Sequence, residues 1–305
     1  MPRPRLEGEH MPSAAPPDFS SWIGRSWVSE DVVAERLVAS FRAIFEPTLA
    51  ALRDGVAPLG IHWCLSPEIA PMSALGPDGH PAKNLHLPPV PQPRRMWAGG
   101  SLELIDALRT GDKVRRETTI AEVKRKEGRT GELWFIGLDH IYSTPRGIAI
   151  RERQSLVYRE AASSVSGARG GPAGATPSAG APAATEESTR QVSRRWQVAT
   201  TPTYLFRYSA ITFNGHRIHY DPDYARDIEG YAGLVVHGPI QATLLLNLAA
   251  ADLGESPRRL QYRGISPCIA GGTLEVCVGS NTAAGMLWTR TPHGPVHMEA
   301  QATAA

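Results

Sequence analysis

Hydrophobic and polar positions follow the same order twice along the chain, a helical stretch and then several strands. In the first half, residues 31–52 carry apolar side chains at helical spacing, and Pro47 is expected to end or kink this helix. A second, shorter helix is expected over 102–109, ending before Gly111. Partly alternating strands are then expected, separated by turns at 127–131 and 145–147. These strands cover 113–126, 133–143 and 148–159.

The second half repeats that order, with helical patterns over 222–229 and 238–253. Strand-like runs follow at 259–265, 273–279, 285–290 and 296–302. The helix over 238–253 is apolar nearly all round, so it is expected to lie in the interior. The pattern predicts an α+β protein. A strongly apolar helix before an antiparallel meander suggests a sheet wrapped around that helix, and two such units suggest an internal pseudo-dimer.

A segment of different composition separates the two units. Residues 163–184 are nearly all Ala, Gly, Ser, Pro and Thr, so burial cannot offset the entropy cost of ordering them. We therefore expect an N-terminal domain over 15–160, a disordered linker over 161–188 and a C-terminal domain over 189–305.

Composition and charge narrow the class of protein. The 305 residues include 32 Lys and Arg and 30 Asp and Glu, a net charge of +2 that gives no reason to expect nucleic acid as a partner. The three cysteines form no CxxC pair, which argues for a reducing compartment and against a disulfide framework. The first 17 residues lack the apolar core of a signal peptide, and no apolar run approaches the ~18 residues of a membrane span. We expect a cytoplasmic protein without a membrane partner.

Potential catalytic groups are concentrated in residues 207–238. Asn214, His216 and His219 share one predicted loop, and His237 and Gly238 precede the buried helix. An imidazole with a reference pKa of about 6.5 can act as acid or base near neutrality, although a loop histidine is more often structural. The start of a buried helix offers unpaired N–H groups to a developing negative charge, although glycine can also simply permit a tight turn. No acidic or thiol pattern accompanies the histidines, so no metal is expected.

This segment resembles the signature of MaoC-like (R)-specific enoyl-CoA hydratases, which have the hot-dog fold. In that family the loop has the sequence Gly-Asp-x-Asn-Pro-Ile/Leu-His, and His-Gly-Met-Leu follows at the start of the central helix. The corresponding segments here are TFNGHRIHYD and EGYAGLVVHGP. They are similar to the double hot-dog subgroup of mesaconyl-C4-CoA and itaconyl-CoA hydratases and mitochondrial 3-hydroxyacyl-thioester dehydratases. Residues 88–100, PPVPQPRRMWAGG, resemble the N-terminal domain of that subgroup.

The resemblance implies a double hot-dog fold, with two antiparallel sheets each wrapped around a central helix. It also implies catalysis in the C-terminal domain, with His219 as general acid–base residue and Gly238 as oxyanion donor. Asn214 occupies the position that the family fills with Asp. A carboxamide cannot exchange a proton near neutrality, so Asn214 is expected to position water through its side-chain oxygen.

The N-terminal domain has no matching Asn/His loop and is expected to shape the acyl pocket without catalysing the reaction. Arginine suits both carboxylates and phosphates, although surface arginines usually bind neither, and a tryptophan can equally be part of the core. The candidate substrate-binding residues are Trp97, Gly99, Arg94, Arg95, Arg207 and His237.

The predicted activity is reversible addition of water across an enoyl thioester double bond, on a short branched dicarboxylic substrate such as mesaconyl-C4-CoA. A 3-hydroxyacyl-thioester dehydratase of fatty-acid or polyketide synthesis is the close alternative. Thioester hydrolysis is disfavoured by Asn214, and a non-catalytic acyl-CoA-binding protein stays open. No cofactor is expected beyond the coenzyme A or acyl carrier of the substrate, and a homo-oligomer stays open.

Overall fold

The structure, a computed structural model, describes residues 17–128, 131–160, 190–280 and 285–304. The first half contains strands β1 (Ser26–Val32), β2 (Arg94–Leu104), β3 (Lys113–Gly128), β4 (Gly131–Thr144) and β5 (Gly147–Arg159). The second half contains β6 (Val192–Ala199), β7 (Arg259–Gly264), β8 (Thr273–Gly279), β9 (Met286–Arg290) and β10 (Val296–Thr303). The α-helices are α1 (Glu35–Phe45), α3 (Pro202–Thr212) and α4 (Gly238–Leu253). Short 3-10 segments occur at Ser20–Trp22, Ile61–Cys64, Met72–Ala74 and Arg217–His219, and a π-helical segment at Tyr224–Ile228.

The ten strands of the described ranges form one sheet, in the order β1-β3-β4-β5-β2-β7-β10-β9-β8-β6, with paired neighbours antiparallel. The two halves have the same topology. From its outer edge the first half is ordered β1-β3-β4-β5-β2, and from the opposite edge the second is ordered β6-β8-β9-β10-β7. The second strands of the two halves, β2 and β7, pair at the centre. This confirms the predicted α+β fold with an internal repeat, and it joins the two expected sheets edge to edge.

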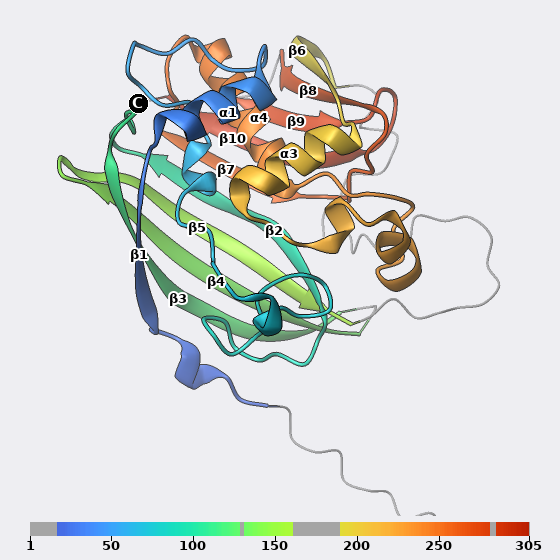
Figure 1. Cartoon of the computed structure of the whole chain (residues 1–305). Coiled ribbons are helices and arrows are strands. Elements are labelled where there is room, and N and C mark those ends of the chain that lie inside the picture. The colour runs from blue at the N-terminus through green and yellow to red at the C-terminus, as the bar shows by residue number, and fades with distance from the viewer. Residues whose placement is uncertain (1–16, 129–130, 161–189, 281–284, 305) are drawn as a thin grey trace, which may run out of the picture.

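The helices lie together on one side of the sheet, which curves around them (Figure 1). Every residue of α4 from Ile240 to Ala250 is buried, as the apolar pattern predicted. Phe41 of α1, Leu205 of α3 and Leu274 of β8 are fully buried in the same core. The main core therefore includes helices from both halves, with α4 at its centre.

Several local predictions are wrong or incomplete. The helix predicted over 102–109 does not exist, because residues up to Leu104 belong to β2 and a loop follows. The helix expected over 31–52 spans only Glu35–Phe45, since residues 31 and 32 pair in β1 and Pro47 follows its end. The helical pattern over 222–229 does form a helix, but its main part, Tyr224–Ile228, is π-helical.

Three strands and one helix were not predicted: β1, β2, β6 and α3. Strands β1 and β6 are the two edges of the sheet, and neither contains a buried residue. The inward residues of these edge strands, such as Trp27 of β1 and Trp196 of β6, are only partly buried, so the hydrophobic alternation is weak. Helix α3 contains Tyr, Phe, Ile and Thr, residues of modest helix propensity. The predicted linker over 161–188 lies outside the described residues, so the division into domains stays a prediction.

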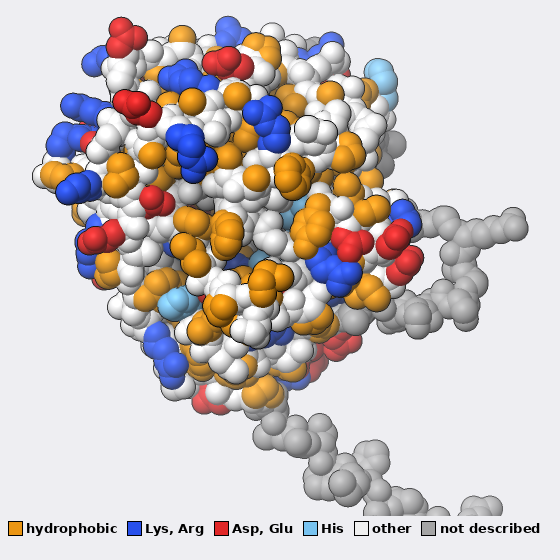
Figure 2. Space-filling model, in the orientation of Figure 1, with side chains coloured by type: hydrophobic (Ala, Val, Ile, Leu, Met, Phe, Trp, Pro, Cys, Tyr) orange, Lys and Arg blue, Asp and Glu red, His pale blue; other side chains and the backbone are white. Residues whose placement is uncertain are grey.

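Two further expectations concern the outside of the protein. No helix in the described ranges is long and apolar enough to cross a membrane. Figure 2 shows Lys and Arg side chains interspersed with Asp and Glu over one face of the described chain, as the near balance of charge suggests.

Candidate active site

A cavity of about 1070 Å³ is lined by residues of both halves. From the second half it receives Asn214, His216, His219, His237 and Gly238. The first half contributes strand residues that include Arg95, Trp97, Tyr142 and Glu152. A second cavity of about 340 Å³ shares His80 and Arg95 with the first. The structure thus brings together the predicted loop, the start of the buried helix and part of the N-terminal motif.

The end of α3 positions Asn214. Phe213 caps the helix in a left-handed conformation, with φ of 50°, and the Asn214 N–H donates to the Ser209 carbonyl at 2.9 Å. The Asn214 Oδ1 accepts the His216 N–H at 3.0 Å, a side-chain turn typical of asparagine. Asn214 therefore shapes the loop and lines the cavity. Its side-chain oxygen keeps a second lone pair that can accept a hydrogen bond from water.

His219 is held in one tautomer. Its Nδ1 lies 2.7 Å from the carbonyl oxygen of Val235, which can only accept, so Nδ1 carries the proton and Nε2 keeps its lone pair. Burial, together with the neighbouring His237 and His216, holds the pKa of His219 well below its ordinary value. The imidazole is therefore neutral near pH 7, and Nε2 can accept a proton.

His237 packs directly on His219. The two rings are stacked, with centroids 3.5 Å apart and an interplanar angle of 16°. The His237 Nε2 lies 2.9 Å from the Ser209 hydroxyl, and burial lowers the pKa of His237 to about 3. These contacts give the predicted substrate-binding residue a role in orienting His219, in addition to its place in the cavity lining.

Gly238 begins α4, where the N–H groups of the first turn have no partner within the helix. Its φ is not positive, so the backbone does not require glycine for a tight turn. A Cβ there would lie 2.3 Å from Cε3 of Trp97. The indole of Trp97, stacked on Tyr262 at 4.7 Å, therefore covers the helix start from the other half of the chain. What excludes a side chain at Gly238 is this close approach.

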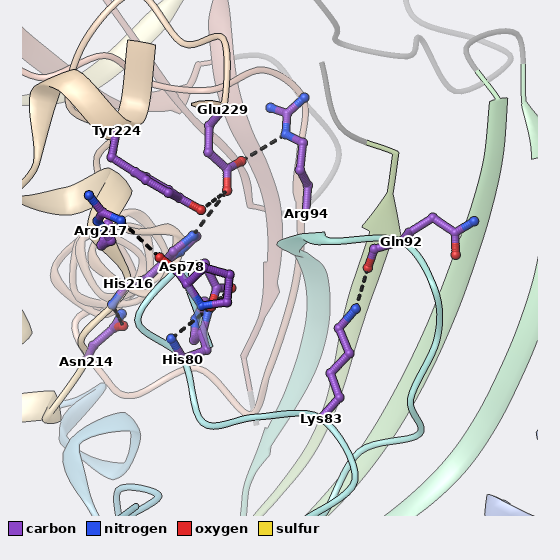
Figure 3. A network of polar contacts seen from close by, with 11 residues as sticks. Asp78, His80, Lys83, Gln92, Arg94, Asn214, His216, Arg217, Tyr224 and Glu229 are labelled. Atoms are coloured by element: carbon purple, nitrogen blue, oxygen red, sulfur yellow. Dashed lines mark hydrogen bonds and ion pairs between the residues drawn. The ribbon is translucent and has the colours of Figure 1, made fainter. Parts of the chain in front are cut away.

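The structure adds a histidine cluster that the sequence reasoning missed. Asp78 Oδ2 lies 2.9 Å from Nδ1 of His80, and the His80 ring is 4.2 Å from that of His216 (Figure 3). Burial alone would raise the pKa of Asp78, but the hydrogen bond from His80 lowers it to about 2. Burial and the charge of Arg95 lower the pKa of His80 to about 4.

This cluster forms because two distant turns touch. The Arg217 N–H donates to the Asp78 carbonyl at 2.9 Å, and a Cβ on Gly79 would lie 1.9 Å from the Gly215 oxygen. The only local signal in the sequence was the turn-forming pair Asp78–Gly79. Asp78, His80 and His216 each offer a metal-ligand atom within 4.8 Å of the others, although the His80 Nδ1 is already bonded to Asp78. The absence of a metal stays a prediction.

A buried carboxyl group, also unpredicted, lines the cavity from the first half. Glu152 accepts hydrogen bonds from Trp63 Nε1 at 2.9 Å, from the Tyr142 hydroxyl at 3.2 Å and from the Tyr262 hydroxyl at 3.4 Å. Tyr142 and Tyr262 lie on β4 and β7, in the two halves of the sheet, and Trp63 lies in the 3-10 segment Ile61–Cys64. Their hydrogen bonds reach both carboxyl oxygens of Glu152 in this wall of the cavity.

The other candidate binding residues differ in their surroundings. Arg94 is buried, and its Nε donates to Glu229 Oε2 at 2.9 Å, an ion pair between the halves. Arg95 is half-buried and lines both cavities. Arg207 is exposed on α3, outside the lining of both cavities. Gly99 lies at the β2–β7 seam, where a Cβ would lie 2.5 Å from the Tyr262 oxygen, and it does not line the cavity.

Comparison with solved structures identifies the fold. HtdX of Mycobacterium tuberculosis superimposes with a TM-score of 0.61 at 16% identity, over 92% of this chain and 100% of that one. The Mycobacterium tuberculosis protein RV0216, described as having a double hotdog fold, superimposes with a TM-score of 0.51 at 12% identity, over 92% and 95%. These likenesses show the double hot-dog fold.

Sequence comparison identifies the family. The chain is 39% identical over 251 residues to mesaconyl-C(4)-CoA hydratase of Chloroflexus aurantiacus, covering 82% of this chain and 85% of that protein. Residues 60–270 match the family model of hydroxyacyl-thioester dehydratase type 2. This match covers more than half of the chain, including the turn with Asp78 and His80 and the loop with Asn214 and His219. The chain is therefore a hydro-lyase that belongs to the hydroxyacyl-thioester dehydratase type 2 family.

Proposed function

We propose that this enzyme reversibly adds water across the double bond of a short enoyl-CoA thioester, with mesaconyl-C4-CoA as the leading substrate. The observation that supports it most is one shared cavity. A neutral His219 with a free Nε2 lines the same cavity as the first turn of a buried helix. The hydratase relative at 39% identity favours the dicarboxylic substrate.

The catalytic cycle needs only groups that line this cavity. Water is held by Asn214 Oδ1 and His219 Nε2, and the thioester oxygen lies at the Gly238 N–H. His219 takes a proton from water as its oxygen bonds to the β-carbon, and the electrons of the double bond move toward the thioester to form an enolate. The Gly238 N–H stabilises the enolate oxygen, an interaction worth about 3 kcal/mol. His219 then returns the proton to the α-carbon, and dehydration runs in reverse.

The alternative is dehydration of 3-hydroxyacyl thioesters in fatty-acid or polyketide synthesis. The description of the matching family supports it. Both activities use the same catalytic groups. They differ in the part of the acyl group beyond the reacting carbons, which the cavity must accommodate.

Incubation with mesaconyl-C4-CoA and with crotonyl-CoA tests the proposal, with the enoyl thioester followed by absorbance and free thiol by a colour reaction. Loss of enoyl absorbance without free thiol supports hydration. Release of thiol would assign a thioesterase, and no change with either substrate would leave an acyl-CoA-binding protein. A higher kcat/KM for crotonyl-CoA would favour the fatty-acyl alternative.

We also propose that the enzyme works in the cytoplasm, without a cofactor of its own and without nucleic acid or membrane partners. Its three cysteines are free and buried, which agrees with a reducing compartment. The edges of the sheet, at β1 and β6, are compatible with further association into a homo-oligomer. Light scattering measures that association directly.

A further inference from the structure

Five basic side chains line the large cavity: Arg95, Arg116, Lys126, Arg159 and Arg263. Most of them are occupied elsewhere. Arg116 donates to the Ser66 carbonyl at 2.6 Å, and Arg263 lies 3.4 Å from Glu299. Lys126 is exposed and lies over the ring of Phe135, and Arg159 also contacts other residues of the chain. These four cations are either engaged or directed to solvent.

Arg95 differs from them. Within the described residues, its guanidinium takes part in no hydrogen bond or ion pair, although it is half-buried. The exposed Glu68 lines the same two cavities but lies outside ion-pair distance of it. An arginine held in a cavity without an anionic partner is well suited to an anionic ligand, because its planar fork matches a carboxylate or a phosphate.

The strand places this charge near the reacting end of the cavity. Arg95 and Trp97 are two residues apart on β2, so they share a face of the strand about 7 Å apart. Trp97 covers the start of α4 at Gly238. The Arg95 charge also acts on His80, whose ring lies 4.2 Å from His216 in the catalytic loop. Arg95 therefore lines the same cavity as the loop with Asn214 and His219.

The wall around Glu152 is unfavourable for a substrate carboxylate. The donors at Glu152, which are Trp63 Nε1 and the two tyrosine hydroxyls, already bond to its own carboxyl oxygens. A substrate carboxylate beside Glu152 would meet another carboxyl group, whose negative charge opposes it. Among the basic residues of the described lining, Arg95 is thus the one whose guanidinium is half-buried and makes no hydrogen bond or ion pair of its own.

We propose that Arg95 binds the free carboxylate of a dicarboxylic enoyl thioester and makes the enzyme specific for that class of substrate. This inference rests on the proposed function. In mesaconyl-C4-CoA the carboxylate is attached to the β-carbon, only a few bonds from the thioester. The phosphates of coenzyme A lie at the far end of the pantetheine arm. A cation beside the reacting carbons matches the first arrangement. It also neutralises the negative charge that would oppose formation of the enolate.

The test compares wild type, Arg95→Gln and Arg95→Lys on three substrates. The first is mesaconyl-C4-CoA, and the second is the pantetheine thioester of the same acyl group, which lacks the nucleotide phosphates. The third is crotonyl-CoA, which lacks the free carboxylate. Arg36→Gln, an exposed arginine on α1, is the matched control. We expect Arg95→Gln to lower kcat/KM by roughly 10- to 100-fold on both mesaconyl thioesters and less than about 3-fold on crotonyl-CoA. Arg95→Lys should recover part of the loss, and Arg36→Gln should match wild type. The midpoint of thermal unfolding reports that each variant is folded.

Two results would overturn the inference while leaving hydration intact. An equal loss on both CoA thioesters that disappears with the pantetheine thioester would assign Arg95 to the phosphates. Unchanged activity of Arg95→Gln on all three substrates would remove it from binding. Wild type that hydrates crotonyl-CoA but neither mesaconyl thioester would instead refute the proposed substrate, and the inference with it.

Discussion

Replacing Gly238 with alanine tests the contact that joins the two halves at the catalytic centre. The added Cβ would lie 2.3, 3.0 and 3.2 Å from three atoms of the Trp97 ring. The ring also stacks on Tyr262 and meets Trp63 edge-on at 5.9 Å, so it cannot move without disturbing other aromatic contacts. Overpacking of this kind costs about 1–3 kcal/mol, and the better helix propensity of alanine offsets up to about 1 kcal/mol of that cost. We expect Gly238→Ala to lower the free energy of unfolding by roughly 1–2 kcal/mol.

A double-mutant cycle with Trp97→Ala separates the clash from the helix effect. Without the indole, Gly238→Ala should be neutral or slightly stabilising, so the two substitutions should couple by more than 1 kcal/mol in chemical denaturation. In the wild-type background kcat should also fall, because a displaced helix start no longer aligns its N–H with the thioester oxygen. If Gly238→Ala has the same small effect with and without Trp97, the close approach does not exist and Trp97 is not what excludes a side chain at position 238.

Three further predictions concern the imidazoles and the asparagine. His219→Gln should lower kcat by roughly 100-fold or more with little change in thermal stability, and a variant within a few-fold of wild type would remove His219 from the mechanism. Asn214→Asp should add a second acidic limb to the pH profile of kcat/KM, since it places a titrating carboxyl beside the water; an unchanged profile would separate position 214 from the chemistry. His62 and His237 have pKa values lowered by burial, to about 4 and about 3. As pH falls, the unfolded chain therefore binds protons at these two histidines before the folded protein does. The free energy of unfolding should decline as pH falls from 6.5 toward 4, by roughly 1 kcal/mol per pH unit for each histidine. Urea denaturation across this range would show a flat profile if the rings were charged in the fold.

The sequence predicted those helices and strands whose hydrophobic pattern and turns depend only on residues close together in the chain. Helix α4 was predicted over its observed bounds because it is buried on all faces, so its apolar residues are uninterrupted. Strands β3, β4 and β5 were found through the turns that separate them. Strand β2 was missed because it pairs with β5 and β7, both far along the chain, and its two glycines break the usual strand pattern.

The same distinction applies to the site. Asn214, His219 and Gly238 lie in one continuous segment whose motif could be recognised, and all three line the cavity. Asp78 and His80 could not be placed, because they reach the site through a contact between Gly79 and Gly215. Arg94, Arg95 and Arg207 were equivalent candidates in the sequence. Only tertiary structure distinguishes the arginine paired with Glu229, the one facing the cavity and the one exposed on α3.

The internal repeat explains why one half completes the site of the other. In each half, the segment between the first and second strands carries the helices and the loops: residues 33–93 in the first half and 200–258 in the second. These equivalent segments touch at Gly79 and Gly215, and the second strands of the two halves pair with each other. A self-complementary contact of this kind is what a two-fold dimer interface would give. In a single chain the two sides are free to differ. The second half keeps the Asn214–His219 loop and the helix start, while the first supplies Trp97 against Gly238 and the unpaired charge of Arg95. The two halves can have different roles because of the duplicated topology. Residues on either side of the contact between segments 33–93 and 200–258 reach the same cavity.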